Sequence, residues 1–158
     1  MKQEAPLPPL NLPPADLRLR RDDDLVRVYD RLRHKYVALT PEEFVRQHFI
    51  HFLIGELGYK PEVMANEVSI KLNDTARRCD TVVFGRDLKP CMIVEYKAPS
   101  VPITQAVFDQ IVRYNMVLRV DYLVVSNGLR HFCCKINYEN FNYTFLPEIP
   151  TYAELKNA

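Results

Sequence analysis

Residues 77–97 read RRCDTVVFGRDLKPCMIVEYK, and this stretch decides the fold. Two apolar runs, at 82–84 and 92–94, stand on either side of the turn-forming segment GRDLKP at 85–90. Successive residues in each run are apolar, so both faces of each strand are expected to be buried. The stretch therefore predicts a β-hairpin at the centre of a sheet.

Three charged residues stand at the end of this hairpin that lies away from the turn: Asp80, Glu95 and Lys97. A turn that closes symmetrically places Val82 opposite Ile93 and, two residues further along, Asp80 opposite Glu95 on the same side of the sheet. Opposed carboxylates repel, and each raises the proton affinity of the other. A cation between them relieves that cost, so the hairpin end is a candidate metal site.

The predicted ion is Mg²⁺, with Mn²⁺ as a substitute, because Mg²⁺ takes one or two protein carboxylates and leaves room for a substrate phosphate. Asp80 and Glu95 are the expected ligands. Lys97 lies on the same strand face as Glu95, about 6 to 7 Å further along, where its ammonium group can orient water or phosphate. These three residues are the predicted catalytic group for hydrolysis of a phosphodiester bond.

The remaining elements are predicted outward from this hairpin. Thr-Pro-Glu-Glu at 40–43 marks the start of a helix, and Gly58 marks its end. A second helix is expected over 104–118, with a face made of Val107, Ile111, Tyr114 and Leu118. Further strands are expected at 62–72, 121–126 and 129–136. This order predicts an α/β fold with a central mixed β-sheet flanked by helices.

The length and composition fit one domain with tails. The chain has 158 residues, of which 47% are hydrophobic and 26% charged, as in an average globular protein. Residues 1–24 form a proline-rich leader that is expected to be extended, and residues 16–35 suggest a short, half-exposed strand. The domain itself is expected over 25–150, followed by a tail at 151–158.

Net charge, cysteine spacing and targeting signals limit the kinds of function and location that the sequence allows. The net charge of +1 excludes a uniformly basic nucleic-acid binder and leaves room for a local positive patch. The four cysteines lack the spacing of a zinc site. No apolar run reaches the roughly 18 residues that a membrane span needs, and the sequence begins without the pattern of a signal peptide. The expected location is cytoplasmic, with no membrane partner.

Several motifs together resemble the PD-(D/E)xK nuclease superfamily, and particularly the amino-terminal nuclease domain of type I restriction enzyme R subunits. The first are the strand RRCD at 77–80 and, about fifteen residues later, EYKAP at 95–99. The helix start TPEEFVRQ at 40–47 and the turn SNG at 126–128 are also similar to that family. The resemblance covers roughly residues 33–136.

This resemblance implies a restriction-endonuclease-like core and a metal-dependent deoxyribonuclease of the restriction endonuclease type. It implies DNA as substrate and restriction-modification or motor subunits as partners, and it leaves a homodimer open. Gln110 and Tyr114 correspond to the family's Gln-x-x-x-Tyr motif, in which Gln110 supports catalysis. Arg77 and Arg78, with Tyr114, are candidate DNA contacts. Glu43 is either a third metal ligand or the Glu of a capping box.

The sequence departs from the family in two ways. Cys79 stands where the proline that names the motif would precede Asp80, and no GxxxxGK[S/T] loop supplies the motor of a complete R subunit. The alternative function is therefore a catalytically silent nuclease-like module that binds DNA or assembles with proteins.

Overall fold

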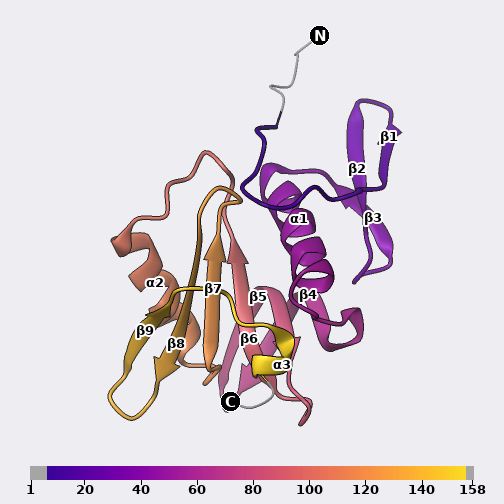
Figure 1. The fold of residues 1–158 in the computed structure, drawn as a ribbon. Coiled ribbons are helices and arrows are strands. Elements are labelled where there is room, and N and C mark those ends of the chain that lie inside the picture. The colour runs from indigo at the N-terminus through magenta and orange to yellow at the C-terminus, as the bar shows by residue number, and fades with distance from the viewer. Residues whose placement is uncertain (1–6, 156–158) are drawn as a thin grey trace.

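The computed structural model describes residues 7–155 and shows two β-sheets with helices packed on them (Figure 1). A six-stranded sheet has the order β4-β5-β6-β7-β8-β9, and a three-stranded sheet has the order β1-β2-β3. The strands are β1 (Leu19–Asp22), β2 (Leu25–Asp30), β3 (Lys35–Ala38), β4 (Met64–Leu72), β5 (Thr75–Phe84), β6 (Pro90–Tyr96), β7 (Tyr122–Ser126), β8 (His131–Asn137) and β9 (Asn142–Leu146). The helices are α1 (Pro41–Gly55), the short 3-10 helix η1 (Pro61–Val63), α2 (Gln105–Met116) and α3 (Tyr152–Leu155). The predicted mixed α/β class is confirmed.

The predicted hairpin is β5 and β6, which lie inside the six-stranded sheet. The two strands are antiparallel, and Val82 pairs with Ile93 as predicted. Near the turn the register shifts, so Phe84 pairs with Pro90 rather than with Cys91, the partner that a symmetric turn requires. This bulge accommodates one extra residue on β6. Because β6 also pairs in parallel with β7, the sheet is mixed.

Helix α1 begins where its sequence signals predict. Thr40 is the N-cap, and its Oγ1 accepts a hydrogen bond from the backbone N–H of Glu43 at 3.1 Å. The helix ends at Gly55, slightly before the predicted stop at Gly58. Gly58 has a φ of 75°, a left-handed conformation that glycine adopts without a steric penalty.

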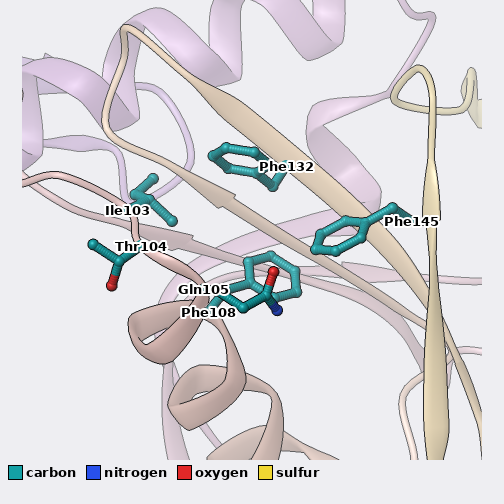
Figure 2. A pocket seen from close by; sticks show the side chains of 6 residues that line it. All are labelled: Ile103, Thr104, Gln105, Phe108, Phe132 and Phe145. Atoms are coloured by element: carbon teal, nitrogen blue, oxygen red, sulfur yellow. The ribbon is translucent and has the colours of Figure 1, made fainter.

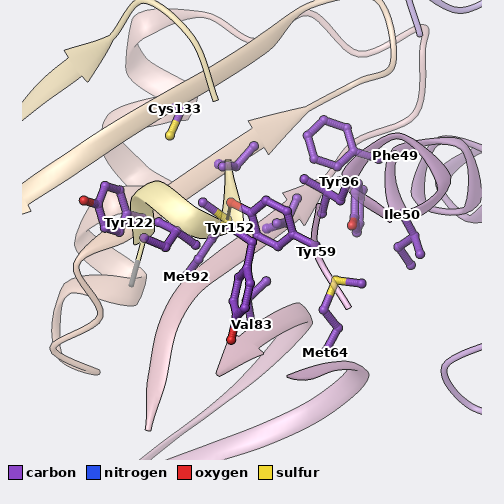
Figure 3. Packing of buried hydrophobic residues seen from close by; sticks show 14 of the residues in the cluster. Phe49, Ile50, Tyr59, Met64, Val83, Met92, Tyr96, Tyr122, Cys133 and Tyr152 are labelled. Carbon is purple, nitrogen blue, oxygen red and sulfur yellow. Dashed lines mark hydrogen bonds between the residues drawn. The ribbon is translucent and has the colours of Figure 1, made fainter. Parts of the chain in front are cut away.

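The helices bury opposite faces of the six-stranded sheet. On one face, Phe49 from α1 packs near Tyr96 of β6, in a cluster that also contains Met92 of that strand (Figure 3). On the other face, Phe108 from α2 joins the core that contains Ile93 of the same strand. Strand β6 is therefore apolar on both sides, as its uninterrupted run of apolar residues requires. The end of this buried strand carries the predicted catalytic residues.

Helix α2 begins as expected, with Thr104 as its N-cap. Its predicted face is only in part the buried one, because Leu118 and Ile111 contact the core and Tyr114 does not. The buried residues are Phe108, Val112 and Asn115, whereas Tyr114 is 47% exposed. Apolar residues occupy adjacent positions in this helix, such as Val107 with Phe108 and Ile111 with Val112, so either of two faces could pack against the sheet. Burial of the large Phe108 ring removes the most apolar surface and sets the orientation.

The ends of the chain hold more structure than the sequence predicts. Three strands replace the single strand expected over 16–35, and β1 lies inside the predicted leader. Residues 7–18 contain neither helix nor strand, as their prolines predict, whereas residues 1–6 of the leader lie outside the described part. Strand β9 is not predicted, and α3 occupies the predicted tail with Tyr152 buried in the core. Within residues 7–155, no helix is long and apolar enough to cross a membrane.

Candidate active site

The structure brings the predicted carboxylates together at the end of the β5–β6 ladder. The last pair of this ladder is Thr81 with Val94, and the next residues on the two strands are Asp80 and Glu95. Oδ2 of Asp80 accepts a hydrogen bond from the backbone N–H of Tyr96 at 2.9 Å, which holds this carboxylate against β6. The two strands therefore position both acids, and Lys97 follows directly after β6.

Lys97 is fixed by its backbone. Its N–H donates to the carbonyl oxygen of Ser126, at the end of β7, over 2.9 Å. This bond extends the parallel pairing of β6 and β7 by one residue. The Cα and Cβ atoms of Lys97 are consequently fixed relative to β6 and β7.

The pKa of Glu95 is shifted strongly from its ordinary value. Burial raises its pKa to about 9. The negative charge of Asp80 and a hydrogen bond between the two carboxyl groups add to this rise, whereas Lys97 opposes it. Oε1 of Glu95 is buried and has no hydrogen-bond partner among the described residues. Such an oxygen is costly to bury unless it finds a partner.

The residues present fit a hard divalent cation. Two carboxyl groups meet, and one of them has a buried oxygen without a partner. A cation bound there would supply that partner and would remove the repulsion between Asp80 and Glu95. Across residues 7–155, no group of three or more His, Cys, Asp or Glu side chains is arranged around a common metal position. The protein would then supply two carboxylates, which is sufficient for Mg²⁺ when water completes its shell.

Glu43 belongs to a buried ion network. Its carboxylate accepts hydrogen bonds from Arg33 at 2.6 Å, Arg46 at 2.8 Å and Gln47 at 3.1 Å. Only half of the capping box is formed. The Thr40 hydroxyl accepts from the N–H of Glu43, but the N–H of Thr40 donates to the carbonyl oxygen of Ala38 rather than to the Glu43 side chain. The role of Glu43 as a third metal ligand stays a prediction.

Sequence reasoning missed Arg46 and Glu67, which connect this network to the site. Arg46 donates to the backbone carbonyl oxygen of Asp80 at 2.8 Å and to Oε1 of Glu67 at 2.7 Å. Burial disfavours the charge of Glu67, but hydrogen bonds from Arg46 and Arg78 outweigh it and lower the pKa of Glu67. Glu43 and Arg46 stand three residues apart in the predicted helix, and this spacing indicates the ion pair between them.

Backbone strain accompanies this contact. Glu67 lies opposite Asp80 on β4, between two regular ladder pairs, and its φ of 54° is left-handed. Residues other than glycine rarely adopt this conformation, and it is found where surrounding structure enforces it. Here the ion pairs of Glu67 with Arg46 and Arg78 enforce it.

The predicted DNA contacts form a second group next to the hairpin. The guanidinium of Arg77 lies 4.7 Å from the centre of the exposed Tyr114 ring, and its Nε donates to the carbonyl oxygen of Tyr114 at 3.2 Å. Arg78 is exposed and pairs with Glu67. Gln110 is exposed one turn before Tyr114, and no contact among the described residues joins it to the catalytic group.

A separate pocket lies at the start of α2 (Figure 2). It is lined by Ile103, Thr104, Gln105, Phe108, Phe132 and Phe145. None of these side chains is ionisable, so the pocket offers no acid, base or metal ligand. This pocket therefore adds no such group to those predicted at the end of the β5–β6 hairpin.

The Glu95→Gln variant tests the electrostatics of this pair. An acid with a higher pKa in the folded protein than in the unfolded chain loses stability as pH rises between the two values. For Glu95 this window runs from 4.5 to about 9. With chelator present, wild type should lose stability across the window, and the variant should lose less because it has no proton to release.

At about pH 8 the Glu95→Gln variant should therefore be more stable than wild type, on the order of 1 kcal/mol or more. Urea unfolding of both proteins at several pH values measures the difference. A variant that is less stable than wild type at every pH would instead identify Glu95 as a structural ion-pair partner.

Comparisons with known proteins identify the family and the fold of this chain. The family model described as "Type I restriction enzyme R protein N terminus (HSDR_N)" matches residues 41–150. The fold is similar to a fragment described as an HsdR subunit of a type I restriction enzyme from Vibrio vulnificus YJ016, with a TM-score of 0.52 and 20% sequence identity. That match covers 75% of this chain and 25% of the other chain. No curated protein matches the chain.

The two matches carry different weight. At 20% identity the structural match shows the fold alone, and the chain spans about a quarter of the length of that solved chain. The family model covers most of the chain and includes Asp80, Glu95 and Lys97. The resemblance that the sequence motifs indicate is confirmed. The chain belongs to the family of type I restriction enzyme R protein N-terminal domains.

Proposed function

We propose that this chain is a Mg²⁺-dependent endonuclease domain that hydrolyses phosphodiester bonds in DNA. The observation that carries the proposal is the position of Asp80 opposite Glu95, whose buried Oε1 has no hydrogen-bond partner within residues 7–155, with Lys97 two residues further along the chain. Family membership supports a role in restriction and modification. We assign the six-stranded sheet with α1 and α2 as its restriction-endonuclease-like core, and restriction-modification or motor subunits as its partners.

Each residue of the catalytic group has a distinct part. Asp80 and Glu95 would hold Mg²⁺ or Mn²⁺. The ion, when bound, lowers the pKa of water and screens negative charge on the phosphate. The Lys97 ammonium donates hydrogen bonds that orient the attacking water or a phosphate oxygen. Arg46 acts through another residue, because it fixes the backbone of Asp80 from the side of α1.

The surrounding residues bind and support the substrate. Arg77 is stacked on Tyr114, and its N–H groups, with those of Arg78, suit contact with the DNA backbone. The family resemblance assigns Gln110, which is exposed on α2, a supporting role in catalysis. Glu43 can join the metal ligands only if the arginines that hold its carboxylate release it.

A second candidate function is a catalytically silent module that binds DNA or assembles with other proteins. The arrangement of Glu43 favours it, since two arginines saturate a carboxylate that the family resemblance assigns to the metal. Such a module has no need to bind a divalent cation. Metal binding therefore discriminates between the two functions.

Thermal unfolding with chelator or with millimolar Mn²⁺ makes this test. Mn²⁺ should stabilise wild type, by about 2.7 kcal/mol when its concentration is a hundred times the dissociation constant. The Glu95→Gln variant lacks a ligand and should respond far less. Asp121→Asn, which removes an exposed carboxylate elsewhere, should respond as wild type does.

If Mn²⁺ shifts the midpoint of none of these proteins, the metal site is wrong. Salt-sensitive DNA binding without metal binding would then support the silent module. Titration calorimetry with Mn²⁺ checks the same result without relying on unfolding.

A further inference from the structure

The three-stranded sheet β1-β2-β3 has no part in the function proposed above. It lies before residue 41, where the match to the family model begins. In Figure 1 it stands beside α1 and extends away from the six-stranded sheet. The composition of its two faces indicates what it does.

One face of this sheet is turned inward and the other outward. Val28 on β2 is fully buried, and the alternation of side chains along a strand puts its neighbours Arg27 and Tyr29 on the opposite face. Across the ladders, Arg20 pairs with Arg27 and Tyr29 pairs with Tyr36. The outer face therefore carries arginines and tyrosines in adjacent pairs.

Two of the three arginines on this outer face, Arg18 and Arg20, are held by aromatic rings. The guanidinium of Arg18 lies 5.1 Å from the centre of the Tyr29 ring, and that of Arg20 lies 4.6 Å from the centre of the Tyr36 ring. The two rings themselves meet edge to face at 5.3 Å. A guanidinium stacked in this way keeps the plane of its N–H donors fixed, although Nε and Nη2 of Arg20 already donate to Asp22 at 3.0 and 2.8 Å. The donors are thus fixed before any ligand arrives.

The charges on this face are unbalanced in favour of an anion. Arg20 and Arg27 are directly opposite each other, and like charges in that position repel. Asp22 pairs with both, at 2.8 and 3.2 Å, and offsets part of this repulsion. No carboxylate within residues 7–155 forms an ion pair with Arg18. Three guanidinium groups and one carboxylate lie on this face, while Asp23 and Asp24 are exposed beyond it in the turn between β1 and β2. The face itself therefore complements a row of phosphates.

The inner face ties the sheet to the candidate active site. Asp30, fully buried on β2, forms an ion pair with Arg33. Arg33 also binds Glu43, which binds Arg46, whose guanidinium donates to the backbone of Asp80. This sequence of contacts is continuous. DNA held on the outer face would therefore have a fixed position relative to the hairpin end.

We infer that the outer face of β1-β2-β3, through Arg18, Arg20 and Arg27 with their tyrosines, binds the phosphate backbone of DNA. The inference rests on the proposed function for its choice of DNA as the ligand. Guanidinium N–H groups donate to phosphate oxygens, and Tyr29 and Tyr36 keep those groups in place. The contacts read no bases, so binding at this surface is independent of sequence.

A charge-matched pair of triple variants tests this surface. The test variant carries Arg18→Gln, Arg20→Gln and Arg27→Gln. The control carries Arg86→Gln, Arg119→Gln and Lys135→Gln, which remove the same charge from exposed positions. The control also removes two stacked cations, because Arg119 lies 5.0 Å from the Tyr138 ring and Lys135 lies 5.6 Å from the Tyr122 ring.

Fluorescence anisotropy with a labelled DNA duplex, in chelator and at several salt concentrations, gives the affinities. The test variant should bind at least about tenfold more weakly than wild type, and the control should bind within about twofold. The slope of log affinity against log salt should be less steep in the test variant by about 2 to 3, the value for three lost phosphate contacts. Arg18→Gln alone, which breaks no ion pair, should reduce the slope by about 1 and serves if the triple variant unfolds.

Equal weakening by both triple variants, or no binding of DNA by wild type, would overturn the inference. So would binding of polyglutamate as tight as binding of DNA, which would identify a surface for acidic proteins. Failure of the nuclease proposal looks different, since wild type would then fail to cleave DNA while the test variant still lost affinity. Normal binding and cleavage by the test variant would overturn this inference and leave the proposed function in place.

Discussion

The Asp80→Asn variant is expected to cleave DNA in Mg²⁺ at least about a thousandfold more slowly than wild type, because loss of a metal ligand removes several kcal/mol of charge stabilisation. Its fold should be intact. Asparagine is nearly isosteric, and its oxygen can still accept the backbone N–H of Tyr96. Single-turnover cleavage of a DNA duplex in Mg²⁺ and in Mn²⁺ measures the effect.

Two further variants make this result specific. Asp121→Asn removes an exposed carboxylate elsewhere and should cleave at the wild-type rate. Lys97→Ala should cleave at least about a hundredfold more slowly, because the group that orients the attacking water is lost. If Asp80→Asn and Lys97→Ala both retain full activity while folded, the hairpin end is not the active site.

The Arg46→Met variant is expected to lower the free energy of unfolding by about 3 to 5 kcal/mol, the range found when one partner of a buried ion pair is removed. Arg46 is 7% exposed and binds the equally buried Glu43 as well as Glu67. Methionine fills a similar volume but leaves both carboxylates without this cation. Urea unfolding at neutral pH gives the difference in free energy.

An exposed ion pair provides the contrast. Arg20→Met breaks the pair with Asp22, in which the side chains are 54% and 40% exposed, and should cost no more than about 1 kcal/mol. Glu43→Gln combined with Arg46→Met should cost less than the sum of the two single changes, since each removes part of the same network. A loss below 1 kcal/mol in Arg46→Met would show that the network adds little to stability.

The hairpin and its charged end could be predicted because their signals are local. Apolar runs of matching length flank a short turn, so the sequence itself sets the register that brings Asp80 and Glu95 together. The start of α1 is equally local, since Thr40 and Pro41 act within one helical turn. These features depend on residues that are close in sequence.

The missed features depend on contacts between distant residues. Nothing near Glu43 in the sequence shows that Arg33, ten positions earlier, competes for its carboxylate. In α2, apolar residues on adjacent positions leave two faces open, and only packing of Phe108 against the sheet selects one. The strands β1 to β3 are short, and arginine and aspartate in β1 and β2 hide the alternation of buried residues such as Val28.

The buried ion pairs also have a consequence for how the protein unfolds. Acid and base alternate along a single series of contacts: Asp30, Arg33, Glu43, Arg46, Glu67 and Arg78. The series starts in β2, passes through α1 and ends between β4 and β5. Separation of the small sheet from the rest would break the ion pair of Arg33 with Glu43 and the hydrogen bond of the fully buried Asp30 with Asn66, and both contacts oppose local opening there. We therefore expect the small sheet and the core to unfold as one cooperative unit, with hydrogen exchange in β2 following that of the central strands.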